Sequence, residues 1–195
     1  MAKAQAISAV GQTILGLLAD NISKTDFPNA LFELYQPSDF QSPMAEGVSL
    51  FLYRVEINAG MRNLPNQVGL DGIVRRAPLP LDLHFLLTVW AKNVVKQQRL
   101  LGIAMQTLAD ASVLSAERLN NFSPEPDVFR PDERIEMIFN SLSLQDISNL
   151  WSAFKLSLPV SIGYIARVVG IDSALPVEEA APVQTREFNF AKKLN

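Results

Sequence analysis

The residues best placed to do chemistry lie in the stretch RRAPLPLDLHFLLTVWA, which runs from Arg75 to Ala91. This stretch contains the only histidine of the chain, His84, two residues after Asp82. The alternation of apolar residues around the pair is typical of a β-strand, in which side chains two residues apart lie on one face of the sheet. The pair is therefore either a catalytic acid and base or the polar face of a strand that another protein covers.

A catalytic role for this pair requires a nucleophile within hydrogen-bond reach, as in a serine–histidine–aspartate triad. The sequence has no G-x-S-x-G turn to present a serine. Neighbours two apart in a strand are also too far apart to guarantee contact. We interpret Asp82 and His84 as part of a strand face near a neighbouring protein. The alternative from a different class of protein is a small hydrolase that uses both residues and an unidentified serine.

Arginines form a second group of candidate residues, and Arg54, Arg62, Arg75 and Arg76 could make a small basic patch. No aromatic residues are interleaved with them as a nucleic-acid surface would require. The whole chain has 17 basic and 20 acidic residues, and its net charge of -3 does not favour nucleic acid or anionic lipid. We interpret the four arginines as ordinary surface residues or as a contact with another protein.

Cofactor and metal chemistry have little support in the sequence. The chain has no cysteines, which excludes thiolate ligands and thiol nucleophiles, and a single histidine leaves little for zinc. Glu125, Asp127, Asp132 and Glu133 are interrupted by prolines and lack the spacing of a calcium loop. No glycine pattern of a nucleotide-binding loop occurs. We therefore expect no cofactor, no metal and no catalytic residue.

The elements that must position these residues follow from the spacing of apolar residues. Helical spacing predicts an amphipathic helix over residues 3–21 and a second helix from Asn93. A short helix is expected after Ser143, with Asp146 three residues later as a variant of the capping box. Two-residue alternation predicts strands that begin near residues 31, 48, 81, 134 and 158. The buried stripe of the second helix is predicted to comprise Val94, Leu101, Met105 and Leu108.

Three segments lack a core pattern. Residues 58–80 are rich in glycine and proline and are too long for a tight hairpin, so we expect an excursion at the sheet's edge. Residues 111–134 are expected to be a long connection. Residues 173–195 are expected to form an extended tail after a domain over residues 1–172. Within the tail, Phe188 and Phe190 alternate with polar residues, as a short edge-pairing strand would.

This order of elements predicts an α+β fold, with a mixed and mainly antiparallel sheet flanked by two longer helices and one short helix. The strands from Val48 and Leu81 are apolar on nearly both faces, more than a sheet with one wet face requires. Because the helices are few, we expect subunit contacts to supply part of the second layer. Trp90 and Trp151 are expected to anchor the core.

Five stretches of the sequence occur in the order and spacing of one protein family. They are SLFLYRVEINAGMRN (49–63), RAPLPLDLHFLLTVWA (76–91), LLGIAMQTLAD (100–110), LWSAF (150–154) and LPVSIGYIARVVGID (158–172). With them the sequence resembles the cap, or tail-terminator, family of extracellular contractile injection particles, which are headless phage-tail-like devices of the antifeeding-prophage and virulence-cassette type. The resemblance covers about residues 5–172. The sequence departs from the family pattern at Phe85, where a tyrosine is common, and at Ala109, where a histidine is often found.

The resemblance implies a non-enzymatic structural protein that forms a six-fold ring at the end of the particle distal to the baseplate. There it would stop growth of the inner tube and anchor the last sheath ring. The implied partners are further copies of the chain, as a homohexamer, and the tube and sheath proteins, with no nucleic acid. Another ring subunit of the same machine, such as a baseplate adaptor or a sheath-related protein, is the alternative.

The location that follows is the bacterial cytoplasm during assembly and then the assembled particle. Polar residues interrupt the apolar stretch near the N-terminus, so we expect no secretion signal. No run of about 18 apolar residues occurs, so we expect no insertion into a membrane.

Overall fold

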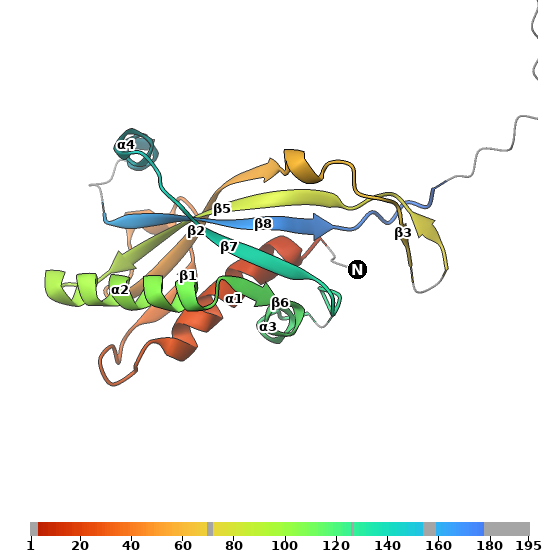
Figure 1. Cartoon of the computed structure of the whole chain (residues 1–195). Helices are drawn as coiled ribbons and strands as arrows, with labels where there is room; N and C mark the ends of the chain where they lie inside the picture. The colour runs from red at the N-terminus through yellow and green to blue at the C-terminus, as the bar shows by residue number, and fades with distance from the viewer. Residues whose placement is uncertain (1–3, 70–71, 126, 154–158, 178–195) are drawn as a thin grey trace, which may run out of the picture.

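The computed structural model describes residues 4–69, 72–125, 127–153 and 159–177 (Figure 1). These residues form a six-stranded sheet with helices on both faces and a separate two-stranded hairpin. In chain order the elements are α1 (Ala6–Asn21), β1 (Leu31–Leu34), η1 (Asp39–Gln41), β2 (Gly47–Ile57), η2 (Ala59–Met61), β3 (Gln67–Val68), β4 (Val74–Arg75), β5 (Leu79–Trp90), α2 (Val94–Asp110), β6 (Val113–Ser115), α3 (Ala116–Asn121), β7 (Arg134–Asn140), α4 (Leu144–Ala153) and β8 (Ser161–Ile171), where η marks a 3-10 helix.

The sheet has the strand order β1-β2-β5-β8-β7-β6. Only the β1–β2 pair is parallel, and the other neighbouring strands are antiparallel. The predicted α+β class with a mixed, mainly antiparallel sheet is therefore confirmed. Two irregularities shift the pairing register, between Leu52 and Arg54 on β2 and between Leu81 and Leu83 on β5 opposite β8.

The first face of the sheet carries the main core. Helices α1, α2 and α3 lie against this face in Figure 1. Alternate residues of β2 and β5 point into it, and Leu50, Leu83, Phe85 and Leu87 are at most 1% exposed. Their burial follows from the two-residue period that the sequence shows.

The second face is divided into two halves. In the covered half, Phe51, Leu86 and Trp90 pack in a cluster beneath η1 and α4. Phe40 of η1 meets Trp151 of α4 edge-to-face, with ring centroids 5.0 Å apart. The chain's own α4 and η1 therefore supply this part of the second layer, which was expected to come in part from subunit contacts.

Two elements differ from the sequence-based expectation. The connection over 111–134 contains strand β6 and helix α3, which are too short to show a period in the sequence. The stripe predicted for α2 is also displaced, since Val94 and Met105 are 65% and 38% exposed. The amide of Gln97 instead donates to the Val89 carbonyl, which fixes the rotation of the helix. The buried residues of α2 are Leu100, Ala104 and Leu108.

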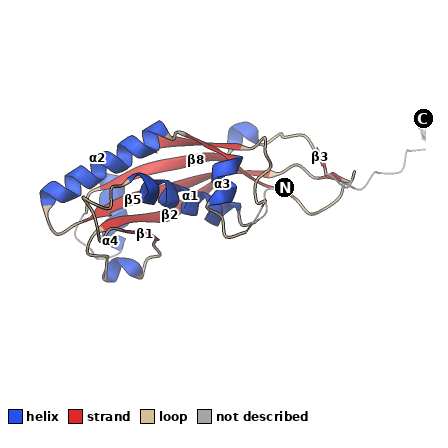
Figure 2. Ribbon diagram, turned by 90° about the horizontal axis from the view of Figure 1, so that it is seen from below, coloured by secondary structure: helices blue, strands red, loops and turns tan. Residues whose placement is uncertain are grey.

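The excursion between β2 and β5 forms an arm that extends away from the sheet (Figures 1 and 2). Strands β3 and β4 pair as a hairpin within it. The chain after β8 then runs along β4, where the Arg76 N–H donates to Leu175 O at 3.2 Å and the Val177 N–H donates to Val74 O at 2.9 Å. We use the name arm for residues 58–69, 72–80 and 173–177. The start of the expected tail thus pairs with β4 through an isolated β-bridge between Arg75 and Pro176.

The described helices are too short or too polar to cross a lipid bilayer.

Candidate interaction surfaces

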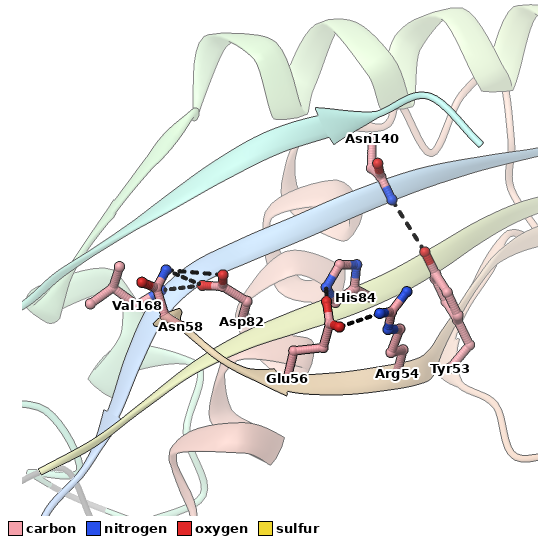
Figure 3. Close-up of polar contacts among 8 residues, drawn as sticks. All are labelled: Tyr53, Arg54, Glu56, Asn58, Asp82, His84, Asn140 and Val168. Atoms are coloured by element: carbon pink, nitrogen blue, oxygen red, sulfur yellow. Dashed lines mark hydrogen bonds and ion pairs between the residues drawn. The ribbon is translucent and has the colours of Figure 1, made fainter. Parts of the chain in front are cut away.

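The open half of the second face lies at the end of the sheet nearest the arm and carries polar side chains on β2 and β5. The bulge in β2 places Arg54 opposite His84 and Glu56 opposite Asp82 (Figure 3). Asp82 and His84 follow the two-residue period of β5 from Leu86, and the bulge in β2 puts Arg54 and Glu56 opposite them, so all four side chains lie on the face of Leu86. The prediction that Asp82 and His84 share a face therefore agrees with the strand pairing.

His84 is 8% exposed. Its Nε2 lies 3.0 Å from Glu56 Oε2, which is an ion-pair distance without the alignment of a hydrogen bond. Glu56 also pairs with Arg54. The ring of Tyr53 meets His84 edge-on, with centroids 6.0 Å apart, and accounts for part of its burial. His84, Glu56 and Arg54 thus form a row of contacting side chains, in which His84 is the most buried.

Tyr53 is held by the strand across the sheet, since Asn140 Nδ2 donates to its hydroxyl at 3.2 Å. Burial raises the pKa of Tyr53 above its usual value, and the Asn140 hydrogen bond opposes that shift only in part. The phenol therefore stays neutral at physiological pH and acts as a hydrogen-bonding group.

The carboxylate of Asp82 accepts hydrogen bonds from groups that shape the fold. Both of its oxygens accept from Asn58 Nδ2 at 3.0 Å, and Oδ1 also accepts from the Val168 N–H at 3.0 Å. Val168 has a φ of 58°, which is unfavourable for a β-branched residue. The carboxylate thus stabilises the irregular part of β8 and joins it to Asn58 at the root of the arm.

A triad is not assembled here. Within the described residues no hydrogen bond or ion pair joins Asp82 to His84, because Asp82 binds Asn58 and Val168 while His84 faces Glu56. No group of three or more acids and histidines that could hold a metal ion occurs among the described residues. The arrangement can orient polar groups on a surface, and the histidine faces Glu56 and not Asp82.

The four candidate arginines do not make one patch. Arg54 lies on the sheet face, whereas Arg62, Arg75 and Arg76 belong to the arm. Arg75 and Arg76 line a small recess at the base of the arm together with Arg130. The sequence analysis missed Arg130, since no local pattern marks it.

Arg130 fixes the arm to the body of the protein. Its Nη1 donates to Gln67 Oε1 on β3 at 2.7 Å, and its Nη2 lies 3.4 Å from Glu133 Oε1. The arm is therefore attached to the loop before β7 as well as to the strands from which it grows. Phe188 and Phe190 lie outside the described residues.

The arm exposes an unusual number of apolar side chains. It has little core of its own, so these side chains face solvent, and clustered apolar exposure of this kind marks interaction surfaces. The sequence pattern could not show this exposure, because it gives the residue types and not which of them other parts of the chain cover. The exposed apolar residues are Met61 (41%), Val68 (68%), Ile73 (46%), Val74 (40%), Leu79 (44%) and Leu175 (57%).

Comparison with known protein families gives one match that spans most of the chain. The model of the family described as Pvc16 N-terminal domain matches residues 9–185. A comparison with curated proteins found no match.

Two solved structures share the fold. The sheath/tube terminator of an extracellular contractile injection system, PVC, in its extended state, has a TM-score of 0.62 and 14% identity, and the match covers 95% of this chain and 63% of that one. The tube-terminating cap of the anti-feeding prophage has a TM-score of 0.56 and 15% identity, with coverage of 93% and 60%. This chain thus spans less than two thirds of the length of either structure, and the predicted tail-terminator-like fold is confirmed.

Proposed function

Since this chain belongs to the Pvc16 N-terminal domain family, we propose that it is the cap, or tail terminator, of a contractile phage-tail-like injection particle. It ends the inner tube and anchors the last sheath ring. The match to the family model over residues 9–185 is the observation that carries this proposal. The shared fold with two terminators of such particles supports it.

The cap acts as a homohexameric ring that contacts tube and sheath proteins. A protein that ends a polymer needs one surface that matches the polymer's end and no second surface that accepts another subunit. Head-to-tail contacts that close into a ring meet this need, because they use up the lateral surfaces of every copy. The exposed apolar residues of the arm support its role as a lateral surface of this kind.

The proposed role is structural and not enzymatic. Termination requires surfaces and no catalytic group, and the partners of Asp82 and His84 give each residue a place in the fold instead. The protein binds no nucleic acid, inserts into no membrane and assembles in the bacterial cytoplasm before it becomes part of the particle.

Deletion of the gene in a strain that produces the particle tests the proposal. Without the cap, tubes grow to uncontrolled lengths or particles fail to finish, so electron micrographs should show a broad length distribution. Expression of the intact chain from a plasmid should restore a uniform length. Normal particles of uniform length in the deletion strain would refute the proposed function.

A further inference from the structure

The arm needs a cover that its own chain does not provide. It consists of short paired segments in which β3 and β4 have two residues each. A ribbon this small is at best marginally stable in water when nothing packs on it. Val68 and Leu175 are nevertheless 68% and 57% exposed. The arm therefore has the properties of a segment that packs against a second molecule.

A groove between α1 and β1 has matching properties. It has a volume of about 530 Å³ and a lining of both apolar and polar residues. Gln12 Oε1 is buried there and accepts no hydrogen bond from the described residues. A buried acceptor without a donor is costly, so rotation of the Gln12 side chain toward a partner's donor would stabilise this site. The lining residues are Gln12, Leu15, Gly16, Ala19, Phe32, Glu33 and Leu34.

The rim of the groove also offers an open strand edge. β1 is the last strand on its side of the sheet. The N–H groups of Leu31 and Tyr35 donate toward the β2 side, to Glu46 O and Leu50 O. Because main-chain groups alternate in direction along a strand, those of Phe32 and Leu34 point outward. An added strand can pair with them while its side chains enter the groove.

The charges of the two surfaces are complementary. Arg62 and Arg76 on the arm make no ion pair with any described residue. Glu33 at the groove and Asp20, which follows Ala19 on α1, likewise make none within the described residues. Opposite charges that are unpaired within one molecule favour pairing between two.

The arm does not cover the groove of its own chain, since it extends away from α1 and β1 (Figure 2) and none of its residues lines the groove. We propose that the arm of one copy docks in the α1–β1 groove of a second copy, where an arm strand pairs with the outer edge of β1. Donor and acceptor surfaces at different places on one chain give a head-to-tail contact, which is the kind that closes into rings. This inference rests on the proposed ring and specifies its lateral contact.

Charge reversal with rescue tests the contact. Arg62→Glu with Arg76→Glu should weaken self-association of the full chain by about tenfold, and Asp20→Lys with Glu33→Lys should do the same. A chain that carries all four substitutions should recover association, because the reversed charges are again complementary. Glu117→Lys with Asp132→Lys reverses two exposed acids away from the groove and is the matched control, which should associate as the unmodified chain does. Analytical ultracentrifugation measures each assembly.

Disulfide trapping identifies the two surfaces directly. The chain has no cysteine of its own, so an engineered pair gives an unambiguous signal. Val68→Cys on the arm with Leu34→Cys at the groove should give disulfide-linked oligomers under mild oxidation. The control pairs Val68→Cys with Val113→Cys on β6 at the other sheet edge, where residue 113 is 50% exposed, and should give far fewer.

The outcomes separate this inference from the proposed function. If rings form and cap particles, but neither charge reversal nor cysteine position matters, the ring stands and the arm–groove contact is wrong. Variants that keep the ring but lose attachment to tube or sheath would likewise overturn the contact and assign the arm to the polymer end. A chain that stays monomeric under all conditions and leaves particle length unchanged when deleted would overturn both.

Discussion

The covered and open halves of the second sheet face are built on the same strands, β2, β5 and β8, yet they bury different chemistry. In the covered half, Leu86 and Trp90 lie beneath α4, and Trp151 closes the cluster at 1% exposure. In the open half, His84 lies two residues before Leu86 on β5. It contacts the carboxylate of Glu56 and the ring of Tyr53. The two-residue period of a strand determines on which face of the sheet a side chain lies. Whether that side chain is buried in a core depends on which later elements of the chain pack on that face.

The largest expected effect lies in the covered half. Trp151→Ala removes the side chain that joins α4 to Phe40 and leaves a cavity, so it should lower the free energy of unfolding by about 3–5 kcal/mol. Chemical denaturation of the purified chain measures this. Leu144→Ala, in the same helix but 74% exposed, is the control and should change little. Equal effects at both positions would show that α4 does not close this face.

The second-largest effect on the free energy of unfolding is expected for Asp82→Ala. It removes the acceptor of the Val168 N–H and of Asn58, so it should lower the free energy of unfolding by about 2 kcal/mol and increase hydrogen exchange at Val168. Asp82→Asn keeps one acceptor oxygen and should lower the free energy of unfolding by a smaller amount. If both substitutions were neutral, Asp82 would not stabilise the irregular part of β8.

His84→Ala is expected to have a smaller effect. It loses a contact with a partly exposed carboxylate and the packing of one buried ring, which together should lower the free energy of unfolding by about 1 kcal/mol. The variant should fold, assemble and restore uniform particle length in the deletion strain. A hydrolytic activity of the unmodified protein that this single change abolishes would replace the structural role with an enzymatic one.

Truncation should have the smallest effect on the stability of the sheet. A chain that ends at Asp172 should melt within a few degrees of the full chain, since residues 173–177 pair only with the arm. It should nevertheless form rings less readily, because the arm loses the segment that pairs with β4. A chain that ends at Val177 keeps this segment and separates its role from that of the residues beyond. Unfolding of the shorter chain would place the tail in the core, and unchanged rings that still cap particles would make it dispensable.

The sequence predicted the parts of the fold that repeat over many residues. The two-residue period of β2, β5 and β8 and the capping pair Ser143 and Asp146 were enough to predict the sheet and α4, and the Asp146 N–H does donate to Ser143 Oγ at 3.1 Å. β6 and α3 were missed because three and six residues hold less than two periods. The stripe of α2 was displaced because its rotation depends on the Gln97 amide, a contact with no local signal.

The candidate surfaces were predicted less completely than the sheet. The sequence placed Asp82 and His84 on one face, but their separate partners come from residues more than 20 positions away, such as Asn58 and Val168. The exposure of the arm was equally hidden, because Val68 and Ile73 have the same residue types as the core. Only the path of the chain decides which of them is covered.

The bond network of Asp82 also has a mechanical consequence. The arm leaves the sheet at the end of β2, returns at the start of β5 and receives the chain that follows β8, and Asp82 joins these three points through Asn58 and Val168. A force applied to the arm is therefore distributed over the three strands β2, β5 and β8 and does not act on a single hairpin connection. Load that enters through the arm would be resisted by the longest hydrogen-bonded ladders in the molecule, which pair β5 with its two neighbours.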